Sequence, residues 1–469
     1  MNSKPLFKNI KHYSSVAFFV ILLFGSVTLH AQKQAKFKTG DKVCFVGNSI
    51  TQDGRYHMLV HAFCATRFPN EFVEFYNCGI SGDVAFGMMN RMDEDILIHQ
   101  PNYAFLMTGM NDIQSHLYGK DIAIDSAMLA QRRRILEGYQ SLTSKIAETF
   151  KEENVSPVFM TPSIYDQTAK IPKENNFGAN DALKECSVHV RNLGKKYNAP
   201  IVDLNPAMEK INFKMQAVDS TSTIVGPDRV HPGDPGHFLM AYNIIKTVMP
   251  SEFVSLIAID SKNRIATKNV DCTVSIHKDQ SSFSFDLVQE SLPFPVTERF
   301  ASALDLIPFQ DELNKEMLFV SKLSKGKYQL NIDDVIIDTL SNKQLKNGVN
   351  MTDYSSTPQY KQAVSVFDLC EKYHTVNRKI RSVAFVQYRM LNKYEGANTI
   401  EGKRAYLDIN LEKQKGKSWY DYNVKTVSEY FENLPKEKQL WGELKELRNQ
   451  IFQINKPRKH TYRLVKVLS

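Results

Sequence analysis

Short apolar runs alternate with stretches of helical spacing over the first half of the chain. Residues 43–46, 71–76, 103–107, 157–160 and 200–202 are mostly apolar and predict strands. Residues 56–68, 83–99, 126–152, 181–197 and 234–248 have the spacing or the starting signals of helices. Alternation of this kind predicts a parallel five-stranded sheet covered on both faces. If the connections between strands are right-handed, this sheet and its helices form a doubly wound, flavodoxin-like, three-layer α/β/α structure.

The pattern changes after Pro250. Residues 254–259, 272–277, 282–288, 317–323, 328–332 and 335–340 predict the short strands of a small antiparallel, β-sandwich-like module. Residues 359–391, 422–431 and 436–454 predict helices, and the polar stretch 394–419 predicts a loop. We therefore expect an α/β domain over 35–250, a β-rich module over 251–350 and a helical region over 351–469.

The first 31 residues have the pattern of a signal peptide. Lys4, Lys8 and Lys11 form a basic start, and residues 16–27 form an apolar stretch too short for a comfortable membrane span. Residues 29–31 are an imperfect version of the small-residue cleavage pattern, and no cysteine follows that would signal a lipoprotein. We expect an exported protein, periplasmic or secreted, with no membrane span after cleavage.

Charge and cysteine usage exclude some classes of function. The formal net charge is +8, but the leader contributes three lysines without an acid, and the other cations are scattered among acids. This distribution argues against nucleic-acid binding. The six cysteines match no metal or redox spacing, and buried free thiols are the expected state, although export permits disulfides. They are Cys44, Cys64, Cys78, Cys186, Cys272 and Cys370.

One pair of histidines raises the question of a metal. His57 and His61 stand four residues apart on a predicted helix, which suits two metal ligands. No carboxylate or thiol with supporting spacing accompanies them. We therefore predict neither a metal nor another cofactor.

Three turns follow successive strands at the edge of the sheet where α/β proteins build their sites. Ser49 comes after the first strand, Gly82 after the second and Asn111 after the third. Taken singly, they are more often a helix cap, a turn glycine and an Asx-turn residue. Taken together, they also suit a nucleophilic hydroxyl beside hydrogen-bond donors for a developing negative charge.

A loop before the last helix of this half supplies a possible base. Asp228 and His231 are three residues apart, so a single turn brings their side chains together. The carboxylate can hold one ring nitrogen while the other faces the site, as a general base requires. An isolated pair with this spacing is usually structural, but its combination with Ser49 favours a serine hydrolase.

These blocks resemble those of the SGNH, or GDSL-type, lipase and acylhydrolase superfamily, and they stand in the family's order. They are Gly47-Asn48-Ser49-Ile50, residues 77–82, Gly109-Met110-Asn111-Asp112 and Asp228-Arg229-Val230-His231. The resemblance covers about residues 40–250. It implies Ser49 as nucleophile, His231 as base and Asp228 as the orienter of the base. It also implies an oxyanion hole made of the Ser49 and Gly82 N–H groups and the Asn111 amide. Asn48 replaces the family's usual aspartate, which removes a charge beside the nucleophile.

The expected function is an exported serine esterase that works through an acyl-enzyme, with deacetylation of carbohydrate as the leading hypothesis. The expected substrate is a small-molecule or polysaccharide ester. A lipid or thioester acylhydrolase remains open. So does a catalytically weak carbohydrate-binding protein that uses its C-terminal regions. Trp419, Tyr420, Tyr422 and Trp441 suit stacking on a sugar ring, although core packing is the commoner use of such residues.

Overall fold

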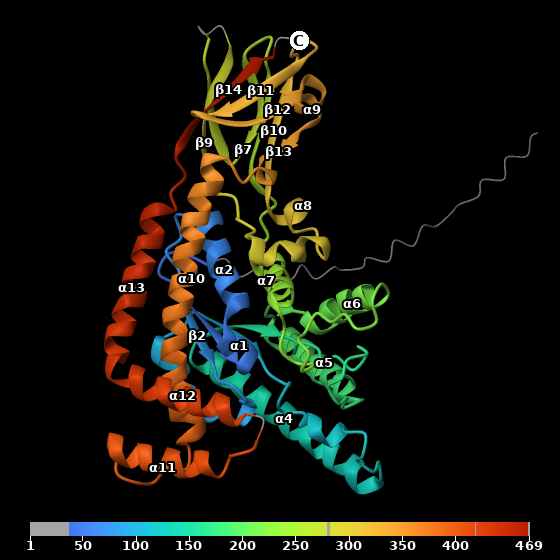
Figure 1. Ribbon diagram of the computed structural model, residues 1–469, viewed down its shortest axis with the longest axis vertical. Coiled ribbons are helices and arrows are strands. Elements are labelled where there is room, and N and C mark those ends of the chain that lie inside the picture. The colour runs from blue at the N-terminus through green and yellow to red at the C-terminus, as the bar shows by residue number, and fades with distance from the viewer. Residues whose placement is uncertain (1–36, 279–281, 418, 468–469) are drawn as a thin grey trace, which may run out of the picture. The chain divides into compact units, whose positions relative to one another are not determined.

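The first sheet of the computed structural model is parallel throughout (Figure 1). The structure describes residues 37–278, 282–417 and 419–467, so the predicted signal peptide lies outside the described residues. The strands lie in the order β2-β1-β3-β4-β5, and each neighbouring pair is parallel. They are β1 (Lys42–Gly47), β2 (Glu74–Gly79), β3 (Tyr103–Met107), β4 (Ser156–Met160) and β5 (Ile201–Val202). The predicted doubly wound α/β fold is confirmed.

Both faces of this sheet are buried. Phe45 on β1 belongs to one hydrophobic cluster, whereas its neighbours Cys44 and Val46 belong to another, because successive side chains of a strand point to opposite faces. Helices supply the cover on both faces. They are α1 (Ser49–Asp53), α2 (Arg55–Arg67), α3 (Ala85–Asn90), α4 (Ser126–Glu152), α5 (Ala179–Tyr197), α6 (Leu204–Gln216) and α7 (Asp234–Val248). The six cysteines are all buried free thiols.

Two further sheets form the β-sandwich-like module. The first, in the order β13-β10-β6-β7, contains β6 (Phe253–Asp260), β7 (Ile265–Val270), β10 (Lys315–Ser321) and β13 (Val349–Asn350). The second, in the order β12-β11-β14-β9-β8, contains β8 (Cys272–Ile276), β9 (Phe283–Gln289), β11 (Lys327–Ile332), β12 (Val335–Ser341) and β14 (Lys459–Lys466). Short helices α8 (Phe309–Leu313) and α9 (Asn342–Asn347) connect strands. Side chains from both sheets share one core. Two features differ from expectation, since β6 and β10 pair in parallel and β14 comes from the far end of the chain.

The longer helices in the described part of the C-terminal region are α10 (Pro358–Phe385), α11 (Ile400–Glu412), α12 (Tyr420–Asn433) and α13 (Glu437–Ile454). Helix α10 lies beside both α2 and α13 (Figure 1). The prediction of a loop over 394–419 was wrong, because α11 occupies much of it. Leu407 and Leu411, one turn apart, bury this helix, and the Thr399 hydroxyl caps its start by accepting the Gly402 N–H. No helix in the described part of the chain combines the length and apolar character needed to cross a bilayer.

A buried ionic network fixes α10 to the end of β2. Arg381 on α10 donates to both carboxylate oxygens of Asp95, at 2.7 and 2.9 Å, and to the Gly79 carbonyl at 3.2 Å. Asp95 also pairs with Arg91, which pairs in turn with Asp83 at 2.9 Å. The four charged side chains are at most 8% exposed. Because each charge has an opposite partner, the network holds α10 at one position along the sheet edge.

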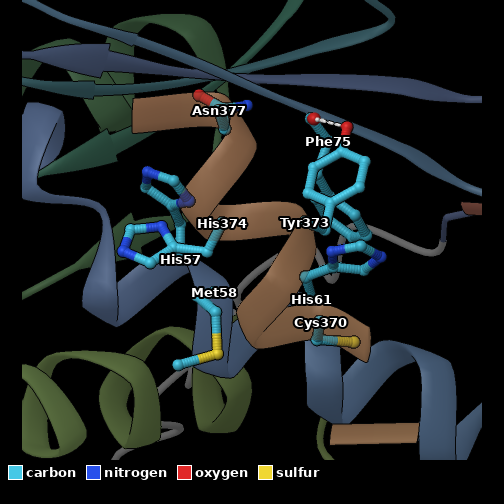
Figure 2. Close-up of a pocket in the computed structure, with 8 residues that line it drawn as sticks. All are labelled: His57, Met58, His61, Phe75, Cys370, Tyr373, His374 and Asn377. Carbon is cyan, nitrogen blue, oxygen red and sulfur yellow. Dashed lines mark hydrogen bonds between the residues drawn. The ribbon is translucent and has the colours of Figure 1, made fainter. Parts of the chain in front are cut away.

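Buried histidines line the contact between α2 and α10. Figure 2 shows His57 and His61 of α2 and His374 of α10 around a cavity of about 10 Å³. Burial lowers the pKa of His57 and of His61 to about 3, and that of His374 to about 4. The same cause lowers the pKa of His237, on α7, to about 3. Among the described residues, no group of three His, Cys, Asp or Glu side chains is arranged to hold a metal.

We predict that acid destabilises the fold through these histidines. Between about pH 6.5 and pH 4 the unfolded chain, with ordinary histidine pKa values, binds protons that the folded chain does not. The free energy of unfolding therefore falls as the pH drops through this window, by up to about 1.4 kcal/mol per pH unit for each histidine. Urea unfolding at about pH 7 and about pH 5 measures the slope. The slope should be shallower in His61→Phe, and an unchanged slope would contradict this account.

Candidate active site

Ser49 is the first residue of α1, directly after the turn that ends β1. Asn48 is the helix cap, because its side-chain oxygen accepts the Ile50 N–H at 3.1 Å. The capping role that the sequence left open for Ser49 therefore belongs to its neighbour. Asn48 is only 2% exposed, so its neutral amide makes this bond without burying a charge.

A chain of hydrogen bonds joins the three residues predicted as a triad. The Ser49 hydroxyl lies 2.7 Å from His231 Nε2, and His231 Nδ1 lies 2.5 Å from Asp228 Oδ2. The other carboxylate oxygen of Asp228 accepts the backbone N–H groups of Val230 and His231, both at 3.0 Å. The imidazole ring is thus held with one nitrogen on the carboxylate and the other on the hydroxyl.

Asp228 is ionised at neutral pH. Its partial burial would by itself raise the pKa, but the hydrogen bonds from the His231 ring and from the backbone N–H groups of His231 and Val230 outweigh this effect. Together they lower the pKa of Asp228 to about 2. A permanent negative charge on one side of the imidazole favours its taking a proton on the other side.

Arg229 positions the loop that carries this pair. It is 3% exposed and has a left-handed backbone, with φ of 69°. Its guanidinium donates to the carbonyls of Asp166, Lys173, Ala169 and Ile171, at distances of 2.8 to 3.2 Å. Sequence reasoning gave Arg229 no role. No local pattern could have shown one, because its four acceptors lie about 60 residues earlier in the chain.

The proposed oxyanion donors lie on the neighbouring turns. Within the described part of the chain, neither the Ser49 nor the Gly82 N–H has a hydrogen-bond partner. Gly82 has a left-handed backbone, with φ of 73°. One N–H of the Asn111 amide donates to the Asp83 carbonyl at 2.9 Å, which places this amide beside Gly82 and leaves its second N–H available.

Asp112 links the turns that follow β2 and β3. Its carboxylate accepts the N–H of Ala85 at 2.7 Å and that of Gly109 at 2.8 Å. Burial raises the pKa of Asp112 to about 6 in spite of these bonds. The turn after β2 is also tied to α1, since the Ser81 N–H donates to the Gln52 side chain at 2.5 Å. Hydrogen bonds therefore connect the three turns that carry the predicted oxyanion donors.

A cavity of about 640 Å³ opens beside Gly82 and is walled by the C-terminal helices. Trp419 and Tyr422, two of the predicted aromatic candidates, line it. Trp441 does not, and it packs instead against Tyr76 and His99. Sequence reasoning missed this cavity because its walls come from segments more than 300 residues apart.

Comparison with known proteins gives three similarities. The model of the GDSL-like Lipase/Acylhydrolase family matches residues 45–239. An acetylxylan esterase of Geobacillus stearothermophilus is 22% identical over 229 residues, which are 45% of this chain and 96% of that protein. The solved structure of a gut microbial diltiazem-metabolizing enzyme is 31% identical, with a TM-score of 0.84, and the match covers 93% of this chain and 100% of that one. The last similarity therefore extends beyond the α/β half.

We predict that Gly79→Ala slows the reaction of Ser49 with a fluorophosphonate. A Cβ at Gly79 would lie 2.2 Å from the Gln52 nitrogen, so α1 would have to move and carry Ser49 with it. We expect a lower melting temperature and labelling at least about tenfold slower. Gly138→Ala is the matched control, because nothing lies within 4 Å of its Cβ and alanine favours the interior of α4. Unchanged labelling of Gly79→Ala would contradict the prediction.

Proposed function

This chain belongs to the SGNH, or GDSL-like, lipase and acylhydrolase superfamily and hydrolyses ester bonds, and we propose that it deacetylates carbohydrate esters outside the cytoplasm. The observation that carries the proposal is the continuous contact from the Ser49 hydroxyl through His231 to Asp228. A serine hydroxyl is a weak nucleophile until a base accepts its proton, and this contact supplies the base.

The reaction proceeds in two steps. His231 Nε2 takes the proton as Ser49 Oγ attacks the ester carbonyl carbon, and the carbonyl oxygen becomes negative. The N–H groups of Ser49 and Gly82 and the free N–H of Asn111 stabilise this charge. The intermediate collapses, the C–O bond to the alcohol breaks, and the alcohol leaves with the proton from His231. Water then attacks the acyl carbon while His231 takes its proton, the bond from Ser49 Oγ to that carbon breaks, and Ser49 Oγ regains the proton from His231 as the acid leaves. Asp228 remains ionised throughout.

Three observations support an acetylated carbohydrate as the substrate. The relative from Geobacillus is an acetylxylan esterase. The cavity beside Gly82 contains exposed aromatic rings and several side-chain amides, which suit a sugar ring. The leader pattern of residues 1–31 supports export to where polysaccharides occur. Apolar side chains such as Phe385, Met390 and Leu407 also line this cavity, but the cations Arg389 and Lys413 do not suit the acyl chain of a lipid.

We predict that Ser49→Ala and His231→Ala each abolish hydrolysis of p-nitrophenyl acetate. Asn111→Ala removes one oxyanion donor and should lower kcat by about 100- to 1000-fold with little change in KM. Initial rates over a range of substrate concentrations give both constants. A fully active Ser49→Ala protein would refute the nucleophile assignment. Labelling of Ser49 by a fluorophosphonate in the wild type distinguishes an enzyme from a binding protein.

Release of acetate from acetylated xylan tests the substrate class. The wild type should release acetate and cleave p-nitrophenyl palmitate far more slowly, and Ser49→Ala should do neither. Preference for the long-chain ester would instead favour a lipid acylhydrolase. Mass spectrometry of the mature protein from a bacterial host tests export, with Gln32 as the expected first residue.

A further inference from the structure

The cavity beside Gly82 has one charged group close to the oxyanion donors. Arg389 lies in the helical turn Val386–Met390, which continues α10. Its guanidinium atoms lie 3.4 to 3.8 Å from the point where a side chain at Gly82 would begin. Because Gly82 carries a predicted oxyanion donor and also lines the cavity, Arg389 is the cation of the cavity wall that lies nearest to that donor.

The charged side chains that line the cavity are both positive. Arg389 and Lys413 line it, and no aspartate or glutamate is among the described residues that do. In residues 37–278, 282–417 and 419–467, neither cationic side chain forms an ion pair or a hydrogen bond. Asp83, next to Gly82 in sequence, is buried and paired with Arg91. The two cations are therefore available to an anion in the cavity.

The remaining wall suits a ring with hydroxyl groups. Tyr422 is 49% exposed and Trp419 is 53% exposed, so part of each ring is open to solvent, although Tyr422 also packs edge-to-face with Phe385. The amides of Gln414 and Asn423 also line the cavity and are joined by a hydrogen bond of 2.6 Å. Aromatic faces stack on the apolar faces of sugar rings, and amides bind their hydroxyl groups.

We propose that the cavity binds the sugar on the alcohol side of the ester and that Arg389 pairs with the carboxylate of a uronic acid. The preferred substrates are then acetylated acidic saccharides. This inference rests on the proposed deacetylase function and adds the chemistry of its substrate. Arginine suits the task because its planar fork can hold both oxygens of a carboxylate.

A matched pair of substrates tests the proposal. Methyl glucuronoside and methyl glucoside, acetylated at the same hydroxyl, differ only in a carboxylate against a hydroxymethyl group. In the wild type, kcat/KM for the glucuronoside should exceed that for the glucoside by about tenfold to a hundredfold, the range for hydrogen bonds to charged groups. Added salt should reduce the ratio, because it screens an exposed cation.

Substitutions of Arg389 test whether this residue causes the preference for the glucuronoside. In Arg389→Met the ratio should fall to about one, because the cation is lost while the length of the side chain is kept. Arg389→Lys should keep part of the ratio, since lysine retains the positive charge but lacks the planar guanidinium group that can bind both carboxylate oxygens. Arg133→Met is the control, because Arg133 is exposed on α4 and does not line the cavity. It should retain both the activity and the ratio of the wild type.

Two outcomes overturn the proposal, namely a wild-type ratio near one or an undiminished ratio in Arg389→Met. Either leaves the esterase function standing if p-nitrophenyl acetate is still cleaved in a Ser49-dependent manner. Titration calorimetry gives a readout independent of catalysis. The unacetylated methyl glucuronoside should bind Ser49→Ala more tightly than the glucoside does, and the addition of Arg389→Met should remove the difference.

Discussion

A buried arginine–carboxylate pair, Arg381 with Asp95, sets the position of the C-terminal helices against the sheet edge. Charges without water cost several kcal/mol each unless they are paired, so α10 cannot slide along the sheet without exposing an unpaired charge. Arg381 also donates to Gly79, at the end of β2. Arg389 follows Arg381 by about two helical turns, and this spacing brings its guanidinium over Gly82. The ion pair therefore helps to fix Arg389 and the cavity wall relative to Gly82.

Local pattern was enough to predict the α/β half and the helices α10, α12 and α13, but not α11 or the cavity. Strands β1, β3 and β4 are mostly apolar runs, and Ser49 comes directly after the turn that ends β1. Asp228 and His231 lie in the loop before α7 and meet Ser49 through that loop. Helix α11 was missed because only Leu407 and Leu411 are buried along its length, so its apolar stripe is too narrow to detect. The cavity could not be predicted, since its walls meet only through the packing of α10 to α12.

Some roles at the site depend on partners that no spacing reveals. Arg229 acts through carbonyl groups of a distant loop, and Asp112 acts through N–H groups on two separate turns. The substitution of Asn48 for the usual aspartate looks disruptive in sequence. In the structure its side-chain oxygen still caps α1, which is what a residue at this position must do. Geometry therefore explains why the turn tolerates a neutral residue.

Strand β14 gives the β-module an order of assembly. It lies between β9 and β11. Tyr462 of β14 pairs with Phe285 of β9, which is synthesised much earlier. Until residues 459–466 have been synthesised, β9 and β11 each present an open edge that could pair with another chain. The second sheet therefore closes only after all four C-terminal helices have left the ribosome. Because the strands that it joins are so distant in sequence, closure of this sheet is expected to be a slow and late step of folding.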